Sequence, residues 1–335
     1  MMMQETLYSY PIMEGLYDLS MINHGTLALD KEYNIYVVIG MPPLPGTVYA
    51  YLKYRLCSID TPWRQRITGL RFCRRIRVYT PRTIVHSTPR LVLDPRFNVN
   101  VPILGLDEIY VLIDPRKSLI DMINHPTNQM QYKLVNIVNE ILSSGVRLND
   151  LGITGSIPLG IAHPRSDIDL LSYGERQAVL LYEWMKGKKR YISKETLQSF
   201  IERYKPDEKT ISLLLSTRTR IKLGNAEVSI IMAQDTLWGP GKRIACGIDP
   251  EKIVVVNQHR KRVRLHIESR QPNALTYPPC VVSMDGDTVL SFDHLLSTIL
   301  YEGGIYDAHV IEVQTNEGNR IFLLGVRERT RFRML

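Results

Sequence analysis

The chain has 335 residues, of which 44% are hydrophobic and 23% are charged, as is usual for a globular protein, and this length predicts two or three domains. No stretch approaches about 18 apolar residues without a charge, and the first residues lack a basic segment followed by an apolar run. We therefore expect neither a transmembrane span nor a secretory signal. The net charge of +8 favours polyanionic partners such as nucleotides or nucleic acid, although simple solubility explains it equally well.

The four cysteines argue against a zinc ribbon, because no two of them have the C-x-x-C spacing. We expect buried or free thiols in a reducing compartment, and hence a cytoplasmic protein. A disulfide between Cys57 and Cys73 is the alternative. The other two cysteines are Cys246 and Cys280.

Residues 1–125 are expected to form a β-rich N-terminal domain. Apolar runs rich in β-branched and aromatic residues predict strands at residues 33–40, 47–56 and 108–114. A Pro-Gly cluster follows the first run and predicts a loop, since proline lacks the backbone donor that a sheet needs. The second run alternates, so its even-numbered residues are expected on one face of the strand. They are Val48, Ala50, Leu52 and Tyr54.

A central domain is expected at residues 126–245. A helix is predicted from residue 130, because apolar residues recur at the spacing of one helical face. They are Leu134, Ile137, Val138, Ile141 and Leu142. Gly145 is expected to end this helix in the left-handed conformation. Further helices are predicted at residues 175–187, 194–204 and 207–217, and strands at residues 151–154, 166–174 and 226–233.

Residues 246–335 are expected to form a β-rich C-terminal domain. Turn residues between apolar runs predict hairpins at residues 283–292 and 315–324, and one helix is expected within residues 291–304. The expected fold class is therefore α/β (α+β), with a central mixed sheet and its helices between two β-rich domains. Each boundary is expected to be accurate to several residues.

Two aspartates, Asp167 and Asp169, form the most informative feature of the sequence. Residues two apart on a strand point the same way, so both carboxylates are expected on one face while Ile168 and Leu170 anchor the strand in the sheet. Two anions so close together are costly unless a cation is bound. Magnesium prefers oxygen ligands and takes one or two protein carboxylates beside substrate phosphates. This acidic pair, Asp167 and Asp169, therefore predicts a divalent-metal site for phosphoryl transfer.

A Gly-Ser turn precedes the acidic pair and predicts a phosphate contact. Gly155 lets the backbone approach a phosphate closely, and Ser156 adds a hydroxyl. Pro158 suits the first turn of a short helix, whose N-terminus favours an anion. Arg165, with His163 as a weaker candidate, precedes the aspartates and is expected to meet phosphate charge.

These residues together resemble the signature of the DNA polymerase beta-type nucleotidyltransferase superfamily. That signature is Gly-Ser, a glycine four residues after the serine, and then Ser-Asp-apolar-Asp. Here Gly160 and Asp167 follow Ser156 by four and eleven residues, as in the minimal nucleotidyltransferase branch. The resemblance covers roughly residues 130–235 and implies that the central domain is a nucleotidyltransferase-like core.

The resemblance implies an NTP substrate and two magnesium (or manganese) ions held by Asp167 and Asp169. It also implies a third carboxylate on a later strand, which completes the metal site and helps to deprotonate the acceptor hydroxyl. Glu227 is the best match and Asp235 a weaker one, with a solvated strand-end residue as the alternative for Glu227.

The same resemblance assigns the triphosphate to Gly155 and Ser156, with Arg165 nearby. The chain departs from the family just after the serine. The minimal branch has basic residues there, whereas this chain has Ile157, Pro158 and Leu159.

Three arginine-rich segments predict contact with RNA or DNA, because arginine and aromatic side chains suit backbone contact and base stacking. They lie at residues 63–82, 259–268 and 327–333. Taken singly, each is better explained as a solvated face. The acceptor of the nucleotide is not specified by the sequence. Two alternatives to an enzyme stay open, namely a non-catalytic nucleic-acid-binding protein on a degenerate core and a module that binds a protein partner.

Overall fold

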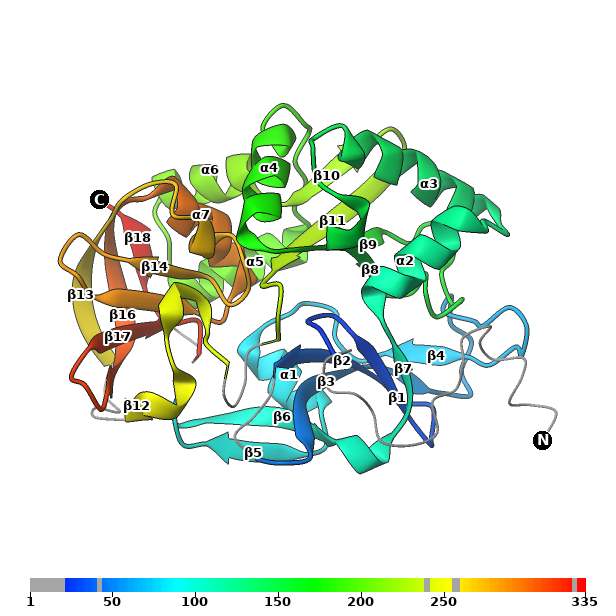
Figure 1. The fold of residues 1–335 in the computed structure, drawn as a ribbon, viewed down its shortest axis with the longest axis horizontal. Coiled ribbons are helices and arrows are strands. Elements are labelled where there is room, and N and C mark those ends of the chain that lie inside the picture. The colour runs from blue at the N-terminus through cyan, green and yellow to red at the C-terminus, as the bar shows by residue number, and fades with distance from the viewer. Residues whose placement is uncertain (1–21, 41–43, 238–241, 255–259, 327–329) are drawn as a thin grey trace.

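The computed structural model describes residues 22–40, 44–237, 242–254, 260–326 and 330–335. Three β-sheets form its framework, one from each third of the chain, and most helices belong to the middle third (Figure 1). This confirms a mixed α/β protein with strand-rich N- and C-terminal parts. Whether the middle third is a nucleotidyltransferase core stays a prediction. None of the helices in the described ranges is both long enough and apolar enough to cross a bilayer.

The N-terminal sheet is antiparallel throughout, in the order β5-β6-β3-β2-β1-β7 with β4 beside β3. Its strands are β1 (Leu27–Asp30), β2 (Ile35–Gly40), β3 (Thr47–Leu56), β4 (Phe72–Arg74), β5 (Leu91–Asp94), β6 (Val99–Gly105) and β7 (Ile109–Ile113). The short helix α1 (Pro81–Ser87) lies between β4 and β5. All three strands expected in this part are confirmed, whereas α1 was not expected.

A β-bulge changes the direction of side chains halfway along β3. Tyr36 of β2 pairs with Leu52, but Ile35 pairs with Tyr54, so Lys53 is an extra residue with no partner on β2. The expectation of one shared face is therefore right for Val48, Ala50 and Leu52 and wrong for Tyr54, which packs with a different apolar cluster. Bulges re-aim side chains and are frequent beside functional sites.

The central sheet has the order β10-β11-β9-β8, with β9 and β11 parallel and the other pairs antiparallel. Its strands are β8 (Leu151–Thr154), β9 (Ile168–Tyr173), β10 (Arg220–Leu223) and β11 (Ala226–Ala233), and its helices are α2 (Pro115–Asn124), α3 (Gln129–Leu142), α4 (Glu175–Met185), α5 (Lys194–Tyr204) and α6 (Glu208–Thr217). The expected helices and strands are confirmed. Helix α2, which lies before the expected boundary at residue 126, adds Leu119 and Met122 to the core around this sheet.

The helices begin where capping residues satisfy free backbone N–H groups. Asp114, Asn128, Ser193 and Asp207 each accept a hydrogen bond from the first turn of the following helix. Gly145 follows the last turn of α3 with a φ of +86°, as expected. One face of the central sheet, including Ile168 and Leu170, packs against these helices. The opposite face is left for the N-terminal sheet and the cavity described below.

The C-terminal sheet is built around the long strand β16, which pairs with four other strands. The elements are β12 (Ile253–Val254), β13 (Arg260–Ile267), β14 (Cys280–Val282), β15 (Thr288–Ser291), α7 (Ser297–Glu302), β16 (Gly304–Thr315), β17 (Arg320–Leu324) and β18 (Phe332–Met334). The two expected hairpins, β14–β15 and β16–β17, and the single helix are confirmed. Arg327 and Arg329 of the third arginine-rich segment lie outside the described residues.

All four cysteines form disulfides, so the expectation of free thiols is wrong. Cys57 is bonded to Cys73 between β3 and β4, and Cys246 is bonded to Cys280. The reducing compartment was inferred from unpaired cysteines, and that inference loses its basis. Stable disulfides occur in oxidising compartments and also in intracellular proteins of hyperthermophiles.

Removing the first disulfide should lower the free energy of unfolding. The bond links residues 16 apart, and closing a loop of that length in the unfolded chain is worth about 3 kcal/mol. We expect a loss of about that size for Cys57→Ser/Cys73→Ser in urea unfolding. A thiol titration of the denatured, unreduced wild-type protein should find no free thiol; four reactive thiols would contradict the pairing.

Candidate functional site

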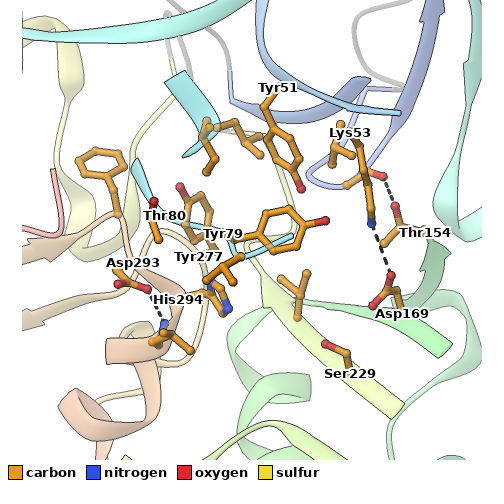
Figure 2. Close-up of a pocket in the computed structure, with 18 of the residues that line it drawn as sticks. Tyr51, Lys53, Tyr79, Thr80, Thr154, Asp169, Ser229, Tyr277, Asp293 and His294 are labelled. Carbon is orange, nitrogen blue, oxygen red and sulfur yellow. Dashed lines mark hydrogen bonds and ion pairs between the residues drawn. The ribbon is translucent and has the colours of Figure 1, made fainter. Parts of the chain in front are cut away.

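A cavity of about 550 Å³ lies where the three parts of the chain meet. Figure 2 shows Lys53 and Asp169 facing each other at one end, Asp293 and His294 at the other, and Tyr277 between them. The N-terminal sheet provides Lys53, the central sheet provides Asp169, and the C-terminal third provides the other three. No single sheet could form this cavity alone.

A row of polar side chains crosses the face of the central sheet that lines the cavity. Asp169 on β9 pairs with Ser229 on β11 and with Thr154 on β8, and Ser229 pairs with Arg220 on β10. All four residues line the cavity. Asp167 stands two residues before Asp169 and therefore points to the same side.

The surface becomes apolar in the next row along the same face. Leu171 pairs with Ile231, and both line the cavity. Beyond them the ring of Tyr277 packs at a tilt of 40° against that of His24, with ring centroids 4.8 Å apart. The cavity thus has a charged end at the acidic pair and an apolar, aromatic middle.

Both aspartates of the acidic pair are held by cations. Arg220 Nη2 lies 2.9 Å from Asp167 Oδ2 and also 3.0 Å from Glu227 Oε2. Lys53 Nζ lies 3.4 Å from Asp169 Oδ2. The neighbouring charge of Asp169, with burial adding to it, raises the pKa of Asp167 despite the opposing effect of Arg220. The two carboxylates therefore repel each other.

Lys53 is charged although its side chain is only 7% exposed. Burial by itself would lower the pKa of its ammonium group, but the fields of Tyr79 and Asp169 outweigh burial and raise that pKa well above its usual value. The ammonium also lies 5.9 Å from the ring centres of Tyr54 and Tyr79. These contacts hold a positive charge beside Asp169.

Gly155 lies directly beneath Asp169. Its φ is +79°, a conformation that side chains rarely adopt, and a Cβ at this position would collide with Asp169 Oδ2. Any other residue at this position would therefore strain the backbone and also collide with the carboxylate of Asp169. The sequence predicted that a phosphate approaches this glycine. In the structure the group next to it is Asp169, and Gly155 is not part of the cavity lining, so the phosphate contact stays a prediction.

Residues 155–160 form hydrogen-bonded turns, so the short helix expected at Pro158 is wrong. Ile161 N donates to Ser156 O at 3.1 Å, and Gly160 N donates to Ile157 O at 3.0 Å. The apolar residues after Ser156 have a structural role. Leu159 packs, like Ile161, into the apolar core of the N-terminal sheet.

The predicted site residues come together only in part. Asp167, Asp169, Ser156 and the exposed Arg165 line the cavity, whereas Glu227 does not. Among the described residues, no three acidic, histidine or cysteine side chains are grouped closely enough to hold a metal ion. The residue opposite Asp169 on β11 is Ser229, which is not an acidic side chain.

The remaining candidate, Asp235, forms an exposed ion pair with Arg116. It is not part of the cavity lining.

Sequence reasoning missed the cations that hold the acidic pair. Lys53 stands in the largely buried part of β3, from Thr47 to Tyr54, and a lysine among these mostly apolar residues is the signal that could have pointed to it. Arg220 begins a short strand after a helix and carries no comparable signal.

Part of the first arginine-rich segment, residues 63–82, contributes to the cavity. Phe72 is 1% exposed and belongs to the core, while Trp63 packs against Tyr54. Arg74 and Tyr79 line the cavity. In the second segment Arg262 is exposed but paired with Asp307. Binding of nucleic acid by these segments stays a prediction.

A buried polar cluster closes the far end of the cavity. Asp293 accepts hydrogen bonds from Arg203, from Tyr204 Oη at 2.8 Å and from Leu295 N at 2.9 Å. The side chains of Arg203 and Asp293 are 9% and 3% exposed. The ion pair joins α5 to the C-terminal third, so it fixes one wall of the cavity.

Two histidines near this cluster should make the protein sensitive to acid. Burial lowers the pKa of His24 and of His294 to about 4, against about 6.5 in an unfolded chain. The unfolded state therefore binds more protons between these values, and stability should fall as the pH drops from 6.5 towards 4. For His24 the loss is up to about 3 kcal/mol.

Urea unfolding at several pH values tests this expectation. His24→Gln should flatten the pH dependence, and His125→Gln, at an exposed histidine, should leave it unchanged. Equal slopes for wild type and His24→Gln would contradict it.

Comparisons of the chain with protein-family models, curated proteins and solved structures found no match. Function is therefore inferred from the residues and geometry of the cavity.

Proposed function

We propose that this protein is a metal-dependent nucleotidyltransferase, which moves a nucleoside monophosphate from an NTP to an acceptor. The observation that supports it most is the acidic pair at the start of β9, where both carboxylates line the cavity and Asp169 lies against Gly155. An NTP substrate also favours a cytoplasmic location, which belongs to this proposal.

The acidic pair fits a magnesium ion. Mutual repulsion raises the pKa of Asp167, so a cation at this point relieves an existing cost. Magnesium usually takes one or two carboxylates and completes its shell with phosphate oxygens and water. Asp167 and Asp169 would hold it, and the bound ion would neutralise the triphosphate and polarise the α-phosphate.

The shape and charge of the cavity also suit a nucleotide. The charged row at Asp169 and Arg220 matches a metal-bound triphosphate, and the apolar row at Leu171 and Ile231 matches a base and sugar. Arg165 at the exposed edge of the cavity adds positive charge for the departing pyrophosphate.

The proposed reaction is an in-line displacement. A hydroxyl oxygen of the acceptor bonds to the α-phosphorus while the bond from that phosphorus to the bridging oxygen breaks, and pyrophosphate leaves with the bonding electrons. The proton of the acceptor passes to a carboxylate at the site. Lys53 and Arg220 hold the acidic pair in position during this exchange, and Ser156 lies near enough to the cavity to contact phosphate.

A panel of α-labelled NTPs with magnesium and a mixture of RNA, DNA, protein and small-molecule acceptors tests the proposal. We expect one NTP to release pyrophosphate and label an acceptor, and Asp167→Asn/Asp169→Asn to reduce labelling at least about 1,000-fold, as for loss of a group that stabilises the transition state. Asp235→Asn, at an exposed carboxylate outside the cavity, is the matched control. Equal labelling by wild type and the double variant would refute catalysis at this site.

A further inference from the structure

The bulge in β3 aims a lysine at the acidic pair. Lys53 is the extra residue between Leu52 and Tyr54, and its amino group reaches across from the N-terminal sheet to Asp169 Oδ2 at 3.4 Å. In a regular strand Lys53 would pair with a residue of β2 and its side chain would follow the alternation of the strand. The bulge removes that pairing and changes the direction of the side chain.

The surroundings of Lys53 hold its charge in one place. The side chain is almost entirely buried, with the rings of Tyr54 and Tyr79 beside the ammonium group. A buried ammonium without a partner is very costly. Separating Lys53 from Asp169 therefore requires that a cation replace the lysine beside the carboxylate or that an anion replace the carboxylate beside the lysine. Lys53 is thus a fixed positive charge at the carboxylate that a second metal ion would share.

The acidic side chains available for metal ions are correspondingly few. Glu227 does not line the cavity, and Ser229 stands opposite Asp169. Gly155 closes the lower side of Asp169. At this end of the cavity the described residues leave Asp167 and Asp169 as the carboxylates for metal ions, and Lys53 stands where a second ion would share Asp169.

We propose that Lys53 takes the place of the second metal ion, so that the protein works with one divalent cation per chain, bound by Asp167 and Asp169. This rests on the proposed function, and it departs from the two ions that the family resemblance implies. The lysine is a positioning residue that supplies a permanent charge.

Manganese binding tests this inference without measuring turnover. The wild-type protein is titrated with Mn²⁺ in the presence of α,β-methylene nucleoside triphosphates of each base, and bound ions are counted by electron paramagnetic resonance. We expect one ion per chain with the spectrum of an isolated Mn²⁺. Two ions about 3.5–4 Å apart, as in two-metal sites, would give a coupled spectrum.

Lys53→Met should admit a second ion and produce the coupled spectrum, because the methionine fills the buried space without a charge. Lys53→Arg keeps the charge and should keep the count at one. Lys186→Met, at a lysine in an exposed ion pair with Glu183, is the matched control and should also keep it at one.

Two coupled ions in the wild-type protein would overturn the role of Lys53 and leave the proposed function standing. One ion in both wild type and Lys53→Met would also overturn it, because the lysine would then not be what excludes the second ion. No bound Mn²⁺ in the wild-type protein would instead contradict the proposed function itself.

Discussion

Asp293→Asn should lower the free energy of unfolding by about 3–5 kcal/mol, the range found when one partner of a buried ion pair is removed. Asp293 accepts hydrogen bonds from Arg203 and Tyr204, and its side chain is 3% exposed. Asparagine has nearly the same shape but leaves the guanidinium of Arg203 without its counter-charge, and it turns an N–H donor towards two other donors. Urea unfolding measures the effect.

A matched control is Glu317→Gln, which removes the acidic partner of Lys252 from an ion pair that is about half exposed. Exposed pairs contribute from nothing to about 1 kcal/mol, so this change should be small. If the two variants lose the same stability, Asp293 is not the buried partner that the structure describes.

The effect of Asp293→Asn should also depend on pH. Burial alone would raise the pKa of Asp293, but Arg203, His294 and the hydrogen bonds to the carboxylate outweigh it, and the pKa is lowered. A lowered carboxyl pKa contributes stability above the unfolded value of about 3.9 and loses it as the pH falls towards the folded value. The difference between wild type and variant should therefore persist from neutral pH to about pH 4 and shrink below it.

Gly155→Ala should reduce nucleotidyl transfer at least about 100-fold, since displacement of a reacting group by about 1 Å has a cost of that order. The added Cβ collides with Asp169 Oδ2 and must push the carboxylate away from its present position. The positive φ adds about 1–2 kcal/mol of instability. Labelling rates and urea unfolding, measured on the same preparation, separate the two effects.

Gly145→Ala isolates the backbone contribution. Its φ is +86°, close to that of Gly155, but a Cβ there has no neighbour within 4 Å. Gly155→Ala should lose at least as much stability as Gly145→Ala, because it adds a collision to the same backbone strain, and only Gly155→Ala should lose activity. Equal activity in the two would show that the position of Asp169 has no bearing on the reaction.

Local features of the sequence were sufficient for much of the fold. The apolar stripe of α3 and the glycine after it follow from one helical period, and Leu134, Val138 and Ile141 are buried as that period requires. The acidic pair could likewise be placed on one face of a strand, because alternation along a strand is a local property.

Contacts between distant segments could not be predicted in the same way. Lys53 and Asp169 are 116 residues apart, and the bulge that aims the lysine depends on the pairing of β2 with β3. The cysteine pairs and the neighbours of Glu227 follow from the same three-dimensional arrangement. Local patterns in a single sequence do not show which distant strands become neighbours. These parts of the site could therefore be identified only from the structure.

The turn after Ser156 has a mechanical consequence for how the molecule could admit a ligand. Leu159 and Ile161 are embedded in the apolar core of the N-terminal sheet, and each is 1% exposed. Separating that sheet from β8 and β9 would expose both side chains to water, which costs about 1.5–3 kcal/mol of free energy for each. The N-terminal sheet is therefore held firmly against β8 and β9. The amide of Ile161 should exchange its hydrogen as slowly as the amides in the middle of β3.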